Sequence, residues 1–164
     1  MSPIGGHRSL GPGDIEDIER LLLTFVRDAG VECAILMDRA GRLLSMAGAT
    51  EGIDGVSFAS LAAADFAASD QLARLLGEKE CTSLFHQGEE RSMFLADVDG
   101  EAVLATVFTE ATTLGLVKVK VRETAPRLTE LFASAAAREP DSEEVLTSDW
   151  ASAAFSEIDR LFSE

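Results

Sequence analysis

The sequence contains few side chains that could form a catalytic site. Its two histidines are His7 and His86, and its two cysteines are Cys33 and Cys81. Catalysis by a cysteine needs a base within hydrogen-bond reach, and Cys81 is the thiol close to His86 in the sequence. The two positions differ by an odd number, so a regular strand would place them on opposite faces. We therefore predict no catalytic dyad and interpret His86 as a turn residue whose ring is hydrogen-bonded locally.

Motifs for phosphate and metal binding are also missing. The chain has neither the G-x-x-x-x-G-K-[ST] loop nor the G-x-G-x-x-G loop, whose backbone N–H groups hold phosphates. Asp97, Asp99 and Glu101 could suggest a cation site, but a hairpin turn at Asp99-Gly100 explains them more simply. The two cysteines have no metal-ligand spacing and are interpreted as buried thiols in a reducing compartment. The sequence therefore predicts no catalytic residue, no metal and no cofactor.

The charge of the chain narrows the class of partner. The sequence has 164 residues, 46% of them hydrophobic, and a formal net charge of −15. Such an acidic surface repels phosphate groups, which argues against nucleic acid and anionic membranes and is compatible with a basic protein partner. No apolar run approaches the roughly 20 residues of a membrane span, and the first residues lack the apolar core of a signal peptide. We expect a cytoplasmic protein that does not insert into a membrane.

The hydrophobic pattern predicts one α/β domain over residues 14–138, after a Gly/Pro-rich and disordered segment at 1–13. Asp14 is a plausible N-cap of a first helix that stops at Gly30. A second, long helix covers residues 57–77. Strands are predicted at 31–37, 42–47, 81–86, 92–98 and 102–108. Two hairpin systems that flank one helix favour a five-stranded antiparallel sheet in an α/β sandwich.

The segment after the fifth strand is ambiguous. Residues 116–121, LVKVKV, alternate like a strand, and Thr124 then resembles an N-cap. The alternative is one long helix from Thr113 with a kink near Pro126. Periodicity alone favours a strand followed by a helix. The proline also counts against the single helix, because a proline inside a helix removes a hydrogen bond and costs roughly 3 kcal/mol unless relieved.

The long helix has two unlike sides. Its large residues are Phe58, Leu61, Leu72, Leu75 and Leu76; the opposite side carries Ala59, Ala63 and Ala67, followed by Asp70, Gln71 and Arg74. A stripe of alanines lets another backbone approach closely, so we expect the large side to pack on the sheet and the alanine side to be covered by a partner. The alternative is that alanine is simply the best helix former. Asp65 falls on the large side, where a carboxylate needs a partner or a solvated groove.

The last residues form a separate acidic segment. Residues 139–149 read as a linker and residues 150–164 as a short amphipathic helix. Residues 139–164 hold eight acids and one arginine, and thus seven of the fifteen net negative charges. The apolar positions are Trp150, Phe155, Ile158, Leu161 and Phe162. A linker followed by such a helix is a common docking device for a partner; the alternative is that it folds back on its own domain.

Several short stretches, in this order, resemble the Roadblock/dynein light chain family and its bacterial MglB branch. They are Ala34-Ile35-Leu36-Met37-Asp38-Arg39-Ala40-Gly41, the helix from Ser60-Leu61-Ala62-Ala63 to Leu75-Leu76-Gly77-Glu78, Phe85-His86-Gln87-Gly88-Glu89, Thr113-Leu114-Gly115-Leu116-Val117 and Ile158-Asp159-Arg160-Leu161-Phe162-Ser163-Glu164. The resemblance covers about residues 14–138 and the C-terminus. It favours the single last helix, kinked near Pro126, over the strand.

The resemblance implies a Roadblock fold with helix–two strands–helix–three strands–helix order, and a homodimer whose sheets join edge to edge. It implies a partner, one small Ras-like GTPase of the MglA type per dimer, which sets cell polarity or motility. The dimer would act as a GTPase-activating protein without an arginine finger, because in phosphoryl transfer positioning and electrostatics dominate. Alternatives are a scaffold that binds the GTPase without changing hydrolysis, and a small-ligand sensor.

The resemblance also suggests site residues. The GTPase-facing helix positions of the family map onto Ala63, Ala67 and Gln71, although Gln71 is bulkier than the small residue often found there. The full predicted GTPase-binding set is Ala59, Ala63, Ala67, Asp70, Gln71 and Arg74. The C-terminal segment, from Trp150 to Phe162, is implied to dock on the same GTPase away from the nucleotide.

Overall fold

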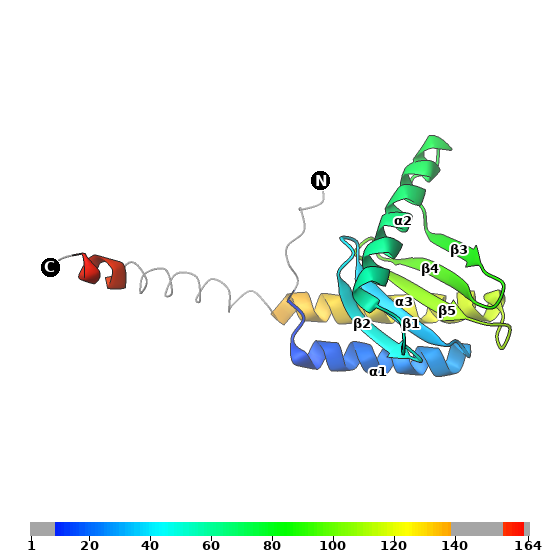
Figure 1. The fold of residues 1–164 in the computed structure, drawn as a ribbon, viewed down its shortest axis with the longest axis horizontal. Coiled ribbons are helices and arrows are strands. Elements are labelled where there is room, and N and C mark those ends of the chain that lie inside the picture. Colours follow the sequence, from blue (N-terminus) through cyan, green and yellow to red (C-terminus); the bar gives the residue numbers. More distant parts are fainter. Residues whose placement is uncertain (1–8, 139–155, 163–164) are drawn as a thin grey trace.

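The fold is built on a five-stranded antiparallel sheet with helices on both faces (Figure 1). It is seen in a computed structural model that describes residues 9–138 and 156–162. The elements are α1 (Pro12–Ala29), β1 (Cys33–Asp38), β2 (Leu43–Gly48), α2 (Gly55–Leu75), β3 (Ser83–Gln87), β4 (Ser92–Val98), β5 (Ala102–Phe108) and α3 (Leu114–Arg138). The strand order is β2-β1-β5-β4-β3. The predicted fold, five antiparallel strands in an α/β sandwich, is confirmed.

Helix α1 begins slightly earlier than the sequence suggested. Gly11 occupies the N-cap position and Pro12 starts the helix, where its missing N–H is not needed. Asp14 is therefore not the cap: its Oδ2 atom accepts a hydrogen bond from the Gly11 N–H at 3.0 Å. The Asp14 carboxylate also pairs with Arg138 at the end of α3. One buried acidic side chain thus ties the start of α1 to the end of α3.

Helices α1 and α3 lie side by side on one face of the sheet (Figure 1). Their apolar sides enclose the first hydrophobic core, which includes Leu22, Phe25, Leu36, Leu104 and Leu128. Successive side chains along each strand point to opposite faces of the sheet. One set enters this core, and the other set enters a second hydrophobic core on the opposite face.

Helix α2 covers the other face of the sheet, and its orientation is opposite to the prediction. Ala59, Ala63 and Phe66 are buried against strand residues such as Ile35 and Val103. The predicted packing of the large side on the sheet is therefore wrong. The physical reason is close approach, because small side chains let the helix lie near the strands and the turn after β1.

The leucines of α2 face the solvent. Leu61 is 72% exposed and Leu75 is 83% exposed. Asp54 caps the helix by accepting a hydrogen bond from the Ser57 N–H at 3.2 Å, and this bonding to Ser57 lowers the pKa of the Asp54 carboxyl. The last turns of α2 project beyond the sheet (Figure 1), so the leucines near its end have no cover within the described residues.

Helix α3 is continuous, so the strand alternative for residues 116–121 is wrong. Val117 and Val121 fall on one helical stripe with Thr124 and Leu128, all of them buried, whereas Val119 between them is exposed. Pro126 lies inside the helix on its exposed side, where solvent can satisfy the carbonyl that proline leaves without a donor. The single last helix favoured by the family resemblance is confirmed, and its kink near Pro126 stays a prediction.

Candidate partner-binding surface

The outer face of α2 and the free edge of β3 form the main unpartnered apolar surface of the described residues. We call the exposed leucines Leu61, Leu72, Leu75 and Leu76 the α2 leucine face; they are 61–83% exposed. Strand β3 pairs with β4 on one side only and is an edge of the sheet. An edge strand offers unpaired N–H and C=O groups to another strand, and several exposed leucines on one side of a helix are typical of an interaction site.

His86 and Asp65 join these two elements. The Nε2 atom of His86, on β3, lies 2.7 Å from the Oδ2 atom of Asp65, on α2. Two expectations are corrected: His86 is a strand residue rather than a turn residue, and its ring binds a residue distant in the sequence. Asp65, which the sequence left without a partner, is half-buried beside the α2 leucine face and is satisfied by the imidazole.

The predicted GTPase-binding residues divide into three groups. Ala59 and Ala63 belong to the core and are 0% and 7% exposed, so they offer no contact surface in this protomer. Ala67, Gln71 and Arg74 are exposed on one flank of α2, which their spacing by four and three residues explains. We call these three residues the α2 flank.

Asp70 has a different role from the one expected. Its Oδ1 atom accepts a hydrogen bond from the Cys81 N–H at 2.7 Å, and its Oδ2 atom lies 3.1 Å from Nη2 of Arg74. The carboxylate thus fastens the segment that leads to β3 onto the end of α2, and it holds the Arg74 side chain along the flank. No sequence signal pointed to this tie, because it joins a helix to the backbone of a loop.

The predicted C-terminal docking residues are partly described. Residues 156–161 are helical. Ile158, Leu161 and Phe162 are exposed, with Phe162 at 85%. Trp150 and Phe155 lie outside the described residues. The apolar side of this short helix therefore has no cover within the part of the chain that the structure describes.

The side chains that could have suggested other chemistry are occupied elsewhere. Asp97 pairs with Arg39 and accepts a hydrogen bond from the Gly100 N–H at 2.9 Å, as a hairpin turn requires. Among the described residues no group of His, Cys, Asp or Glu side chains is arranged to hold a metal ion. Cys33 is a free, buried thiol whose pKa is raised by burial, and Cys81 is free and half-buried.

A search for membrane-spanning helices, made over the described residues, finds none of sufficient length and apolarity.

Comparison with known proteins identifies the family. The Roadblock/LC7 domain profile matches residues 17–108, over half of the chain. Together with the antiparallel sheet and its helices, this match shows that the chain belongs to the Roadblock/LC7 family. A search of curated proteins finds no match.

Within this family the chain is similar to MglB proteins of known structure. It is 34% identical to Myxococcus xanthus MglB, with 77% of this chain and 96% of that chain covered and a TM-score of 0.72. It is 28% identical to the gliding protein MglB from Thermus thermophilus, with 80% and 99% covered and a TM-score of 0.72. A structure described as MglB with tetrameric arrangement is 29% identical, with 80% of this chain and 99% of that chain covered and a TM-score of 0.74.

Proposed function

We propose that this protein is a homodimeric regulator of a small Ras-like GTPase of the MglA type, controlling cell polarity or motility from the cytoplasm. The observation that carries the proposal is the 34% identity to an MglB over nearly the whole of that protein. The unpartnered apolar surface and the lack of a catalytic arrangement among the described residues support a binding protein rather than an enzyme.

The α2 leucine face and β3 are proposed as the dimer surface. Two copies of β3 would pair at their free edges, and two α2 helices would lie together above the joined sheet. Burying four exposed leucines is a substantial apolar gain, at roughly 25 cal/mol per Å² removed from water. His86 and Asp65 stabilise this arrangement by holding β3 against α2 in each protomer.

The α2 flank is proposed as the GTPase-contacting surface. Ala67 allows close approach, Gln71 offers an amide donor and acceptor, and Arg74 is held along the helix by Asp70. Since Arg74 is already paired, we assign it no role as an arginine finger. One GTPase would bind per dimer, and the dimer would reposition the switch loops of the GTPase. The catalytic groups would all belong to the GTPase. The C-terminal segment would dock on the same GTPase away from the nucleotide.

A scaffold that binds the GTPase without changing hydrolysis is the alternative, and one experiment separates the two. The purified protein is mixed with the Ras-like GTPase of the same organism loaded with GTP. Complex mass is measured by light scattering, and single-turnover hydrolysis is followed with and without the protein. The proposal expects one GTPase per two copies of this chain and faster hydrolysis. Binding with an unchanged rate supports the scaffold, and no binding refutes both.

A further inference from the structure

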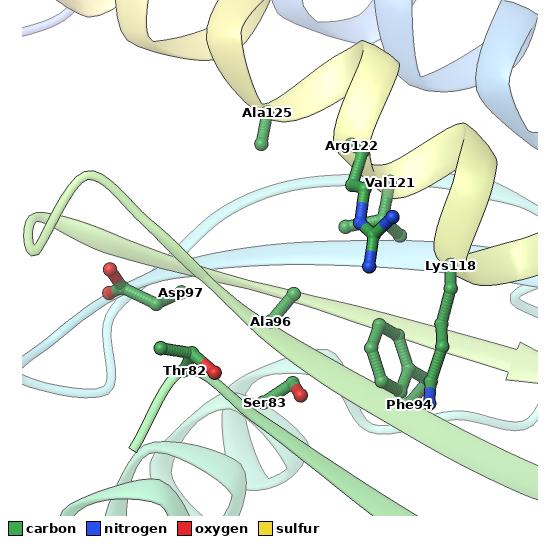
Figure 2. A pocket seen from close by; sticks show the side chains of 9 residues that line it. All are labelled: Thr82, Ser83, Phe94, Ala96, Asp97, Lys118, Val121, Arg122 and Ala125. Carbon is green, nitrogen blue, oxygen red and sulfur yellow. The ribbon is translucent and has the colours of Figure 1, made fainter. Parts of the chain in front are cut away.

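A second candidate site lies on the opposite face of the sheet from α2. A cavity of about 280 Å³ opens between α3 and the strands β3 and β4. Figure 2 shows the side chain of Arg122 extending from α3 into this space, with Lys118 beside the ring of Phe94 and Ser83 across from them. We call this space the α3–β3 cavity. It is separate from the α2 leucine face and from the α2 flank.

The two cations of the cavity lack a carboxylate partner among the described residues. Lys118 and Arg122 are one helical turn apart on α3, so both point to the same side. Neither forms an ion pair with a described residue, whereas arginines such as Arg39, Arg74 and Arg138 do. Asp97, which also lines the cavity, is already bound to Arg39. In a chain with a net charge of −15, two neighbouring cations without a counter-charge suit an acidic ligand.

The cavity also offers apolar contact. The Nζ atom of Lys118 lies 6.0 Å from the ring centroid of Phe94, which forms part of the cavity wall. Phe85 is opposite Phe94 in the β3–β4 register and stacks on Phe108 with ring centroids 6.3 Å apart. Phe85 is exposed. Phe94 itself is buried, so the site combines a basic rim with one exposed aromatic ring next to the cavity, that of Phe85, which fits an acidic amphipathic peptide.

The C-terminal segment of this chain has that chemistry. Residues 139–164 carry eight acids and one arginine; five of the acids lie in 139–149, and residues 150–162 hold Glu157, Asp159 and Arg160. The described helix at 156–161 exposes Ile158 and Leu161. The segment is long enough to reach the cavity. Arg122 lies about 24 Å from the end of α3, at a rise of 1.5 Å per helical residue. Residues 139–155, if extended, span up to roughly 56 Å.

We propose that, in the protein without its partner, residues 150–162 dock on the α3–β3 cavity of their own chain. Glu157 and the acids of the preceding residues 139–149 face Lys118 and Arg122. The apolar side covers Phe85, which is exposed. Docking there withholds the segment from other proteins, so a partner that binds the segment must first displace it. The inference needs no GTPase, so its failure would leave the proposed function standing.

Trp150 allows a direct test because it is the single tryptophan of the chain. Its fluorescence in the full-length protein is quenched with acrylamide, a neutral quencher, at increasing salt. Docking predicts weak quenching at low salt. Quenching should strengthen as salt rises from about 0.01 M to about 1 M, where the Debye length falls from about 30 Å to about 3 Å.

Charge reversal locates the docking site. The double variant Lys118→Glu/Arg122→Glu should raise the quenching of Trp150 towards that of a free indole at every salt concentration. Exposed ion pairs are worth up to about 1 kcal/mol, so each lost cation should reduce the docked-to-undocked ratio up to about five-fold. The matched control Lys79→Glu/Arg127→Glu makes the same change in net charge outside the cavity and should leave quenching unchanged. Circular dichroism checks that both variants are folded.

Three results would overturn the inference. Trp150 could be fully quenched in the unmodified protein at low salt, which means that the segment is not docked. The control variant could expose Trp150 as much as the cavity variant does, which means that only net charge matters. Inorganic phosphate could shift the NMR amide signals of Lys118 and Arg122 while Trp150 stays exposed, which would make the cavity a small-anion site instead.

Discussion

Asp65 on α2 and His86 on β3 meet with 2.7 Å between Oδ2 and Nε2. This contact crosses from the helix that covers one face of the sheet to the strand at the edge of that sheet. Strand β3 is bonded to a neighbouring strand on one side only, so its position depends partly on what holds it from α2. The pair therefore fixes the relative position of the two elements that we propose as the dimer surface.

The first prediction concerns this pair. Replacing His86 with Ala should loosen the β3 edge and weaken self-association, with a small loss in the free energy of unfolding, below about 1 kcal/mol, because both side chains are partly exposed. Asp65→Asn is the control, since an amide oxygen can still accept a hydrogen bond from the ring. Dimer dissociation is measured by analytical ultracentrifugation. Equal dissociation constants for His86→Ala and the unmodified protein would show that the contact does not position β3.

The second prediction concerns the α2 leucine face. Replacing Leu72 and Leu75 with Glu places two like charges opposite their symmetry copies and removes apolar contact. We expect a monomer by light scattering with little change in circular dichroism, because both side chains are already exposed in the protomer. The matched control is Leu23→Glu on α1, an exposed leucine on the other side of the sheet. A dimer that survives the double substitution would place the interface elsewhere.

The third prediction separates the alanines that the sequence grouped together. Ala67→Arg on the exposed α2 flank should abolish stimulation of the GTPase and leave the fold intact. Ala137→Arg, at an exposed position of α3, is the control that makes the same change away from the flank. Single-turnover GTP hydrolysis is the measurement. A normal rate with Ala67→Arg would remove the α2 flank from the proposed GTPase contact.

Ala63→Arg should behave differently, because Ala63 lies in the core between α2 and the sheet. A guanidinium there has no room and no partner, and burying a charge without a partner costs several kcal/mol. We expect loss of the folded protomer in a thermal melt. A folded Ala63→Arg protein would mean that α2 is able to move away from the sheet.

The inverted orientation of α2 shows what periodicity can and cannot predict. The pattern correctly indicated a long helix with two unlike sides, and the strand pattern predicted the sheet. It could not decide which side faces the core, because large apolar residues are buried equally well by a sheet or by a second protein. In α2 the buried stripe is formed by Ala59, Ala62, Ala63 and Phe66, and the leucines are exposed.

The candidate site was predicted less completely than the fold. Helical spacing grouped Ala67, Gln71 and Arg74 on one side of the helix, but it placed Ala59 and Ala63, which are buried, on the same side. The contacts of Asp65 with His86 and of Asp70 with the Cys81 N–H join groups from different elements. Such contacts depend on the tertiary placement of α2 against β3, for which local sequence carries no signal. Likewise, LVKVKV alternates as a strand would, but Val117 and Val121 also lie four apart, so a helix can bury both on one side.

The last prediction concerns Pro126, which lies on the exposed side of α3. Proline lacks the N–H that would bond the carbonyl of Arg122, so α3 is weakened there by roughly 3 kcal/mol relative to alanine. Pro126→Ala restores the bond. The substitution also raises the conformational entropy of the unfolded chain, which lowers the free energy of unfolding by about 0.4–1 kcal/mol. We expect the free energy of unfolding in urea to rise by about 2 kcal/mol. Ala133→Gly, at an exposed interior position of the same helix, should lower it by about 1 kcal/mol. An unchanged or lower stability of Pro126→Ala would mean that the backbone geometry set by Pro126 is needed to seat α3 on the sheet and on α1.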